Sequence, residues 1–326
     1  MLQKLRPFQR KIRKKLEQLK HAETNTRQEK EAIHHICELA KKGKLIRGSM
    51  ILYLASLHQE EPPYSLGAAY EILHTGLLIH DDVIDEDDIR RDVKSTRSLY
   101  ATDKTQKYGD NQAICVGDIA LFYGMEKIVE CEATNRDIIV QLLKQFRTTG
   151  GGQMLDIEIT DSEVASKEDI LSMYKYKTAH YTFTTPLLLG LKHNQEISKT
   201  TEKDIEILGE KLGVLFQLRD DYLAYTPKKK TGKTKYNDVR EDKKTVIRTV
   251  LEKENPAVKD LYGKKDLSKK DKELLEETFN NVKSTYMSSL RQKEQQILEI
   301  INRTEFEDHL KKEFRQLTRY LCTRTK

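Results

Sequence analysis

The chain has 326 residues, of which 34% are charged and 37% hydrophobic, with 15 glycines, 6 prolines and no tryptophan. This length suits one large domain or two ordinary ones, and the shortage of helix-breaking residues indicates an all-α fold. The formal net charge of +6 comes from 58 basic and 52 acidic residues. Because no basic stripe interleaved with aromatic residues stands out, the composition argues against a nucleic-acid-binding protein.

Apolar residues recur at helical spacing along most of the chain, and no run shows the strict alternation of a half-buried strand. Breaks fall at Gly43, at residues 62–63, around residues 108–110 and across residues 227–237. None of them resembles a domain linker, so we predict one compact helical domain over residues 1–326. The predicted helices cover residues 8–20, 26–41, 46–58, 65–86, 111–133, 135–160, 168–191, 201–225, 243–253, 268–302 and 304–322.

The first 20 residues are basic and could mimic a transit peptide, but they are poor in serine and run into further helix. We therefore expect a surface helix there. The four cysteines are scattered singly, without the spacing of a zinc site or a disulfide framework, which fits a reducing cytoplasm. No apolar run reaches the roughly 18 residues that a membrane span needs. We expect a cytoplasmic protein without stable membrane insertion.

Three aspartates, Asp81, Asp82 and Asp85, stand at the end of an apolar helix predicted from residue 65. Asp81 and Asp85 are four residues apart, so they lie on one face of the helix, one turn apart. Like charges at the end of an apolar helix repel each other unless a cation lies between them. These residues are therefore candidate ligands of a divalent metal, with a solvated helix end as the alternative.

A second acidic pair, Asp220 and Asp221, ends another amphipathic helix. If the two helices pack side by side, their acidic ends can meet across a cavity. Such a site could hold a polyanion through several Mg²⁺ ions, because oxygen-rich sites select hard cations. One pair of neighbouring aspartates is usually a solvated helix end, but two pairs after apolar helices favour the metal interpretation.

Basic residues recur where a diphosphate would need them. Lys44 and Arg47 are three residues apart at a predicted helix start, where backbone N–H groups also favour an anion. Each basic residue alone would be an ordinary surface charge, but together they favour diphosphate binding. The set comprises Lys44, Arg47, Arg90, Arg91, Lys177, Lys233 and Lys243.

These motifs resemble, in type and order, those of the trans-isoprenyl diphosphate synthases of the polyprenyl synthetase family, such as geranylgeranyl and polyprenyl diphosphate synthases. A single aspartate-rich motif would be weak evidence, whereas this many motifs in the same order are specific. They comprise Gly43-Lys44-x-x-Arg47, His74 seven residues before Asp81, the first aspartate-rich motif with Arg90-Arg91, Gly117-Asp118, Gly152-Gln153-x-x-Asp156, Lys177-Thr178-Ala179, Phe216-Gln217-x-x-Asp220-Asp221, Gly232-Lys233, the segment from Asp238 to Thr245, and Tyr320 with Arg324.

The resemblance implies the isoprenoid synthase fold, an all-α barrel of helices around a deep central cavity, usually in a homodimer. It also implies a prenyltransferase that joins isopentenyl diphosphate to an allylic diphosphate with magnesium as cofactor. By this resemblance Asp81, Asp85 and Asp220 would hold about three magnesium ions on the allylic diphosphate. Asp82 and Asp221 are the neighbouring candidate ligands.

The resemblance further assigns the basic residues to two substrates. One group would contact the oxygens of the allylic diphosphate: Arg90, Lys177, Lys233 and Lys243. A second group would bind isopentenyl diphosphate: Lys44, Arg47, His74 and Arg91. Thr178 and Gln217 would line the place where the carbocation forms, which makes them, with Lys177, the candidate catalytic residues.

The product length is predicted from the residues before the first aspartate motif. In enzymes of this kind, bulky residues four or five positions before it close the channel, and here these positions hold Leu77 and Gly76. Because neither is aromatic, we expect a product of C20 or longer, with Leu73 and Tyr70 as a possible floor. Gly76→Phe should then shorten the product, unless Gly76 serves only the close packing of helices.

Two departures from the family pattern leave alternatives open. Ala224 stands where a further aspartate is common, so we expect weaker metal binding, and a non-catalytic regulatory subunit of a heteromeric synthase remains an alternative. The segment from Asp92 to Thr96 replaces a usual Gly-x-Pro-Thr, so the resemblance does not define the shape of that loop. A class I terpene cyclase is a further alternative, but the basic isopentenyl site argues against it.

Overall fold

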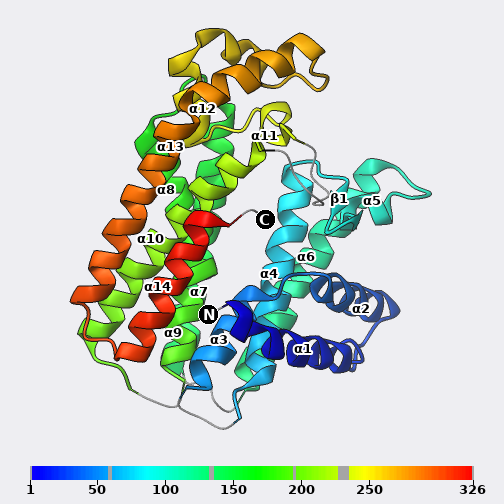
Figure 1. The fold of residues 1–326 in the computed structure, drawn as a ribbon. Helices are drawn as coiled ribbons and strands as arrows, with labels where there is room; N and C mark the ends of the chain where they lie inside the picture. Colours follow the sequence, from blue (N-terminus) through cyan, green and yellow to red (C-terminus); the bar gives the residue numbers. More distant parts are fainter. Residues whose placement is uncertain (1, 58–60, 132–135, 194–195, 227–234, 325–326) are drawn as a thin grey trace. The chain divides into compact units, whose positions relative to one another are not determined.

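The computed structural model describes residues 2–57, 61–131, 136–193, 196–226 and 235–324. Its contacts divide the chain into two compact units. The N-terminal unit comprises Leu2–Gln141 and Pro186–Glu196, and the C-terminal unit comprises Leu142–Thr185 and Ile197–Lys326, as can be followed by colour in Figure 1. The prediction of a single domain over residues 1–326 stays a prediction.

The N-terminal unit is built around the close pairing of helices α4 and α6. Their backbones approach because glycines face the contact: a Cβ atom at Gly76 would lie 3.0 Å from the Cβ atom of Ala120. The apolar faces of the other helices cover this pair and complete a buried core. The helices of this unit are α1 (Leu2–Leu19), α2 (Arg27–Lys41), α3 (Ile46–Ala55), α4 (Tyr64–Ile84), α5 (Thr96–Tyr100) and α6 (Gln106–Val129).

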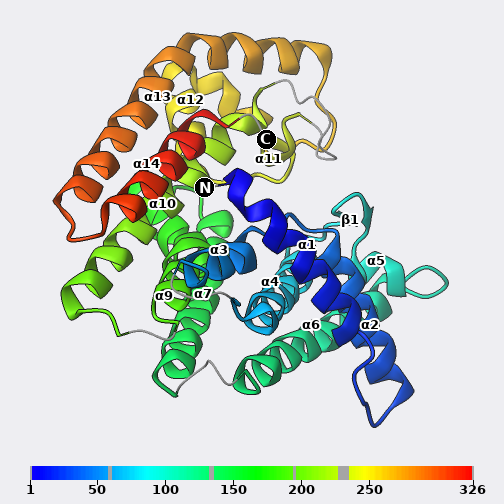
Figure 2. The ribbon, with the colours of Figure 1, turned by 60° about the horizontal axis from the view of Figure 1, so that its bottom comes forward.

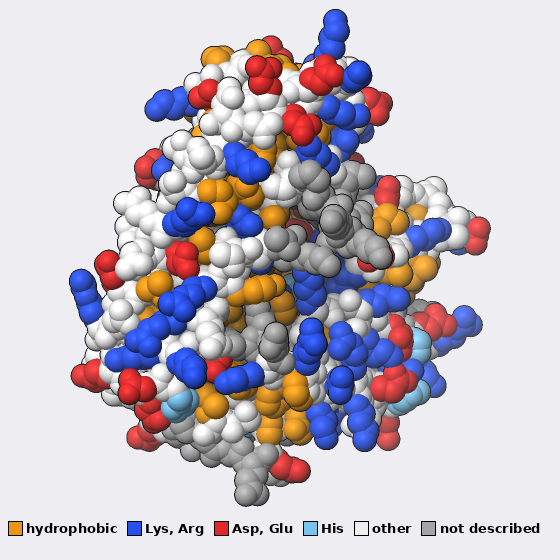
Figure 3. Space-filling model, viewed as in Figure 1, with side chains coloured by type: hydrophobic (Ala, Val, Ile, Leu, Met, Phe, Trp, Pro, Cys, Tyr) orange, Lys and Arg blue, Asp and Glu red, His pale blue; other side chains and the backbone are white. Residues whose placement is uncertain are grey.

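Helix α1 has a basic outer face and an apolar inner face. Leu5, Ile12 and Leu16 are completely buried, whereas Lys and Arg side chains gather over α1 and α2 in Figure 3. The helix begins at Leu2 and runs through Pro7, earlier than the predicted start at residue 8. The observed amphipathic helix at the surface therefore agrees with the expected surface helix.

A short hairpin follows the first aspartate motif, in the segment whose shape the family resemblance left open. Strand β1 (Ile89–Arg90) pairs antiparallel with β2 (Val93–Lys94). Arg91 and Asp92 form the two-residue connection, and both have positive φ, at 55° and 63°. Positive φ at both turn residues matches the right-handed twist of a hairpin. The turn therefore fixes the direction in which the chain leaves the acidic end of α4.

Helix α10 is the central element of the C-terminal unit and packs against η1, α13 and α14. The segment η1 is a π-helix, which closes its hydrogen bonds one residue further along the chain than an α-helix does. The unit contains α8 (Lys167–Met173), η1 (Tyr174–Thr184), α10 (Lys199–Ala224), α11 (Asn237–Arg240), α12 (Val246–Glu254), the 3₁₀-helix η2 (Pro256–Leu261), α13 (Lys269–Arg303) and α14 (Asp308–Thr323), which Figure 2 shows from a second side.

The all-α prediction is confirmed, and most predicted helices match an observed one within a few residues. The main difference lies in the predicted helix 168–191, which consists of α8, η1 and α9 (Thr185–Leu191) in succession. Helices α7 (Arg136–Asp161) and α9 each have residues in both units. All four cysteines are free thiols. In the described parts of the chain, no helix combines the length and the apolar character needed to cross a bilayer.

Candidate functional site

The end of α4 presents the first aspartate motif as the sequence predicts. Asp81 lies in the last turn of the helix and Asp85 is its C-cap residue, and both are partly exposed. The backbone N–H of Asp85 donates to the carbonyl oxygen of Asp81 at 2.8 Å, so the chain is still helical between them. The two carboxylates therefore share one face of the last turn.

Asp82 differs from its neighbours because its side chain is buried, with 0% exposure, and forms an ion pair with Arg90. Burial raises the pKa of Asp82 to about 6, and Arg90 acts in the opposite direction. The same guanidinium group donates to Asp87 at 3.1 Å and lies 3.7 Å from the carboxylate of Asp81. Arg90, on strand β1, is thereby held beside the acidic end of α4.

His74 is a buried histidine that lies among basic residues of the N-terminal unit. The Nε2 atom of His74 lies 3.0 Å from Nη1 of Arg47. Because a guanidinium group can only donate, Nε2 is the acceptor and the ring proton is on Nδ1. Burial lowers the pKa of His74 well below its ordinary value, so the ring is neutral at pH 7. Three nearby guanidinium charges act in the same direction, those of Arg47, Arg91 and Arg90.

Arg91 is fixed by the backbone at the end of α2. Its Nη1 atom donates to the carbonyl oxygen of Leu39 at 2.6 Å. A Cβ atom at Gly43 would lie 2.9 Å from Cζ of Arg91, so this close approach depends on the glycine. Burial lowers the pKa of Arg91 to about 10, which still leaves it charged at pH 7. Lys44, next to the glycine, is exposed.

Glu71 is a residue of this region that sequence reasoning missed. Its side chain is 1% exposed, and its Oε1 atom accepts the backbone N–H of Gly48 at 2.9 Å, in the first turn of α3. The charges of Arg47 and Arg91 oppose the rise in the pKa of Glu71 that burial causes. A glutamate three residues before His74 on an apolar helix face is the signal that could have revealed it.

The end of α10 presents the second aspartate pair, and its two members lie in different surroundings. The side chain of Asp220 is 47% exposed and accepts from Nη2 of Arg324 at 2.7 Å. Asp221 is 1% exposed. Arg219 donates to the carbonyl oxygen of Arg324 at 2.7 and 2.9 Å, so the end of α14 is tied to α10 at this point. Ala224, in the last turn of α10, is buried.

The predicted catalytic residues of η1 and α10 are in contact with each other. The Thr178 hydroxyl group donates to Oε1 of Gln217 at 3.5 Å, and Nε2 of Gln217 donates to Oδ1 of Asp221 at 3.0 Å. Oδ2 of Asp221 accepts from the hydroxyl group of Tyr174, a residue that the sequence did not single out. Lys177, also in η1, forms an ion pair with Asp156 of α7, which belongs to the Gly152-Gln153-x-x-Asp156 motif.

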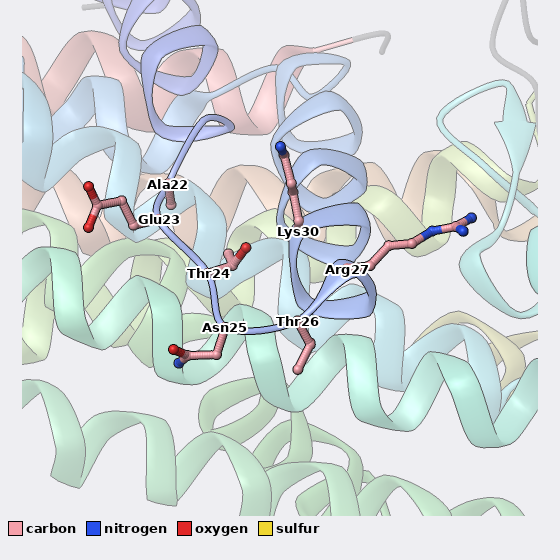
Figure 4. A pocket seen from close by; sticks show the side chains of 7 residues that line it. All are labelled: Ala22, Glu23, Thr24, Asn25, Thr26, Arg27 and Lys30. Atoms are coloured by element: carbon pink, nitrogen blue, oxygen red, sulfur yellow. The ribbon is translucent and has the colours of Figure 1, made fainter.

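Two further predicted lysines follow the second aspartate pair. Lys243 forms an ion pair with Glu241 at 2.9 Å. Lys233 lies outside the described residues, as does Gly232. Away from all of these residues, the loop between α1 and α2 lines an open pocket, shown in Figure 4, whose lining residues are Ala22, Glu23, Thr24, Asn25, Thr26, Arg27 and Lys30. None of the predicted site residues lies in this pocket.

The ends of α4 and α10 fit a hard divalent cation because their donors are carboxylate oxygens. Among the described residues, no three or more His, Cys, Asp or Glu side chains form a preassembled metal cluster. Basic groups lie against the acidic ends instead, with Arg90 beside Asp81 and Asp82, and Arg324 on Asp220. Each unit thus brings carboxylates and guanidinium groups together, which is the electrostatic pattern of a site for a polyanion and its cations.

Comparisons with known proteins agree with this pattern. The family model described as polyprenyl synthetase matches residues 27–282. A geranylgeranyl diphosphate synthase of Sulfolobus acidocaldarius is 30% identical over 257 residues, which cover 74% of this chain and 73% of the relative. A short chain isoprenyl diphosphate synthase of Methanocaldococcus jannaschii is 28% identical, over 72% of this chain and 71% of the relative.

Solved structures share the fold of this chain. A geranylgeranyl pyrophosphate synthase of Corynebacterium glutamicum, in complex with isoprenyl diphosphate and magnesium, matches with a TM-score of 0.84 at 24% identity. The match covers 98% of this chain and 99% of that one. A heptaprenyl diphosphate synthase of Staphylococcus aureus matches with a TM-score of 0.79 at 20% identity, over 99% of both chains.

Proposed function

This chain belongs to the polyprenyl synthetase family and has the all-α isoprenoid synthase fold. We infer from this membership that it is a prenyltransferase. This confirms the family and the fold class predicted from the motifs. We propose that the enzyme condenses isopentenyl diphosphate with an allylic diphosphate and releases diphosphate. The product that we propose is a trans-prenyl diphosphate of C20 or longer.

The observation that best supports the proposal is the group of three arginines around one neutral histidine. Arg90 is compensated by its ion pairs with Asp82 and Asp87, whereas Arg47 and Arg91 both act on the one buried carboxylate of Glu71. Two positive charges beside one carboxylate favour an additional negative charge. A diphosphate supplies that charge and can accept from several guanidinium groups at once. We propose that Arg47, Arg91 and His74, with Lys44, bind isopentenyl diphosphate. A class I terpene cyclase has no use for such a site.

We propose magnesium as the cofactor, with about three ions per site. Asp81 and Asp85 in the N-terminal unit and Asp220 in the C-terminal unit are the proposed ligands. When bound, the ions neutralise charge that grows on the leaving diphosphate. The same proposal gives Arg90, Lys177, Lys233 and Lys243 the task of binding oxygens of the allylic diphosphate. Lys177 suits this task because Asp156 holds its ammonium group in one place.

The proposed reaction begins when the allylic carbon–oxygen bond breaks and the diphosphate leaves with the electron pair. Arginines and lysines that already face the diphosphate stabilise this charge without reorganising. The carbonyl dipole of Gln217 and the hydroxyl oxygen of Thr178 stabilise the allylic cation. The double bond of isopentenyl diphosphate then attacks the cation, and the released diphosphate is the proposed acceptor of the final proton. Exclusion of water protects the cation from being quenched to an alcohol.

The proposal is tested by incubating the pure chain with magnesium, labelled isopentenyl diphosphate and one allylic diphosphate of C5, C10, C15 or C20. We expect dephosphorylated products of C20 or longer, formed only when both substrates are present. Products from an allylic diphosphate alone would indicate a cyclase. Complete inactivity of the chain alone, restored by a second synthase subunit, would indicate a regulatory subunit.

The structure changes how the product length should be tested. Gly76 of α4 is buried against α6. A Cβ atom added there would lie 3.1 Å from the carbonyl oxygen of Gly117 and 3.0 Å from the Cβ atom of Ala120. Phenylalanine at this position would separate the two helices. The alternative interpretation of Gly76, close helix packing, is therefore the one that the contacts favour, and Gly76→Phe is a poor probe of chain length.

Leu77→Phe is the better probe. Leu77 is only partly buried and precedes Asp81 by four residues, so it lies on the face of α4 that carries the metal-binding carboxylate. We expect this variant to shorten the main product by at least one C5 unit, because a larger ring blocks the growing chain. The measurement is chromatography of the dephosphorylated products. An unchanged main product would contradict the proposal.

We also propose a homodimer in the cytoplasm. The free thiols of all four cysteines support the location. The dimer is supported by exposed apolar side chains of α6, where Ile114 is 45%, Phe122 77% and Val129 57% exposed. Several large apolar side chains exposed on one helix favour a protein–protein contact.

A further inference from the structure

Asp221 has the surroundings of a positioning residue and not those of a metal ligand. It is 1% exposed, and each of its carboxylate oxygens already accepts a hydrogen bond, one from Gln217 and one from Tyr174. Its neighbour Asp220 is open to solvent over 47% of its side chain. An ion that approaches the end of α10 from solvent therefore meets Asp220, whereas Asp221 faces the protein interior.

The contact between Asp221 and Gln217 decides which way the side-chain amide of Gln217 points. An amide carries an oxygen acceptor on one side and an NH₂ donor on the other, and the two orientations have nearly the same shape. Nε2 of Gln217 donates to Oδ1 of Asp221 at 3.0 Å, so the NH₂ group of the amide points toward Asp221. The carbonyl oxygen of Gln217 is left on the side of Thr178, at 3.5 Å from its hydroxyl oxygen.

Tyr174 holds Asp221 in turn. Its hydroxyl oxygen accepts the backbone N–H of Val246 at 3.2 Å, in the first turn of α12. Since a hydroxyl group has one proton, that proton is directed to Asp221. The start of α12 thus fixes Tyr174, which fixes Asp221, which fixes Gln217.

We propose that Asp221, held by Tyr174, positions the amide of Gln217 so that its carbonyl oxygen faces the allylic cation during prenyl transfer. The negative end of the carbonyl dipole stabilises the cation, whereas the NH₂ group would repel it. This proposal rests on the proposed function. It gives Asp221 a role different from the magnesium ligand that the motif predicts, and it gives Tyr174 a role that the motif does not contain.

The first test is Asp221→Asn. Asparagine has the same shape but can present either an oxygen or an NH₂ group to Gln217, so the amide is free to turn. We expect kcat to fall about 10- to 100-fold, less than the roughly 100- to 1,000-fold typical of removing a direct electrostatic stabiliser. KM for both substrates and the magnesium concentration for half-maximal rate should stay as in the parent. Asp220→Asn, the matched control, should raise that magnesium concentration.

A double-mutant cycle shows whether Asp221 acts through Gln217. Once Gln217→Met has removed the amide, Asp221→Asn should change kcat by less than twofold, because there is no carbonyl oxygen left to direct. Tyr174→Phe should lower kcat in the same direction, with a smaller effect, and should also lose its effect in the Gln217→Met background. Tyr174→Phe keeps the carboxylate, so it tests the proposal even if Asp221→Asn fails to fold.

Two results would overturn the proposal. A raised magnesium requirement for Asp221→Asn, equal to that of Asp220→Asn, would make Asp221 a metal ligand. Effects of Asp221→Asn and Gln217→Met on kcat that multiply would show that the two side chains act independently. An inactive parent chain would instead overturn the proposed function, and with it this inference, so the two failures are distinguishable.

Discussion

Asp81→Asn is expected to lower kcat about 1,000-fold, equivalent to about 4 kcal/mol of transition-state stabilisation. Asp81 is a partly exposed carboxylate in the last turn of α4, one helical turn from Asp85. A neutral amide is a much weaker ligand for a hard cation than a carboxylate. The magnesium ion that we propose Asp81 to hold would bind less tightly and less precisely. Steady-state kinetics across a magnesium titration measures both consequences.

The matched control for this variant is Asp161→Asn. Asp161 also ends a helix, α7, and is exposed, but it belongs to no proposed site. Its substitution removes the same charge and should leave kcat within twofold of the parent. If kcat of Asp81→Asn stays within tenfold of the parent at saturating magnesium, the proposal that the end of α4 binds magnesium is wrong.

Gly213→Ala is expected to lower the free energy of unfolding by about 3 kcal/mol. A Cβ atom at Gly213 would lie 2.2 Å from the Cβ atom of Ala179 and 2.3 Å from its Cα atom. The conflict is with backbone and with a rigid methyl group, so neither side can move away without separating α10 from η1. Because η1 carries Lys177 and Thr178, we expect activity to fall as well. Urea unfolding followed by circular dichroism measures the change.

Gly150→Ala is the control for Gly213→Ala and should have the opposite sign. Gly150 lies within α7, and a Cβ atom there would have no heavy atom within 4 Å. Alanine in an exposed helix interior is more favourable than glycine by about 0.5–1 kcal/mol. A loss of stability in both variants would show that the packing of α10 on η1 is not the cause.

The acidic ends of α4 and α10 could be predicted from sequence because they depend on local rules. Apolar residues at helical spacing define each helix, and aspartates where the apolar run stops define its end. The predicted ranges 65–86 and 201–225 correspond to Tyr64–Ile84 and Lys199–Ala224. Arg47 and the neutral His74, which lie in contact, were singled out from sequence because both belong to the motif pattern of the family resemblance.

Other features depend on contacts between distant segments, which helical spacing does not contain. Tyr174 and Asp221 are 47 positions apart, and only the packing of η1 on α10 brings them together. The π-helix itself has the same apolar pattern as an α-helix over so short a stretch. The hairpin after Asp85 was missed because Arg91 and Asp92 are not the residues that usually form a two-residue turn with positive φ.

The π-helical winding of η1 has a consequence for inherited variation in this segment. The eleven residues from Tyr174 to Thr184 keep the direction of Lys177 and Thr178 only while the number of residues stays the same. Loss of one codon would let the segment wind as an ordinary α-helix and would turn whatever follows by about 100°. A substitution in this segment changes one side chain, whereas a single insertion or deletion would redirect all those beyond it.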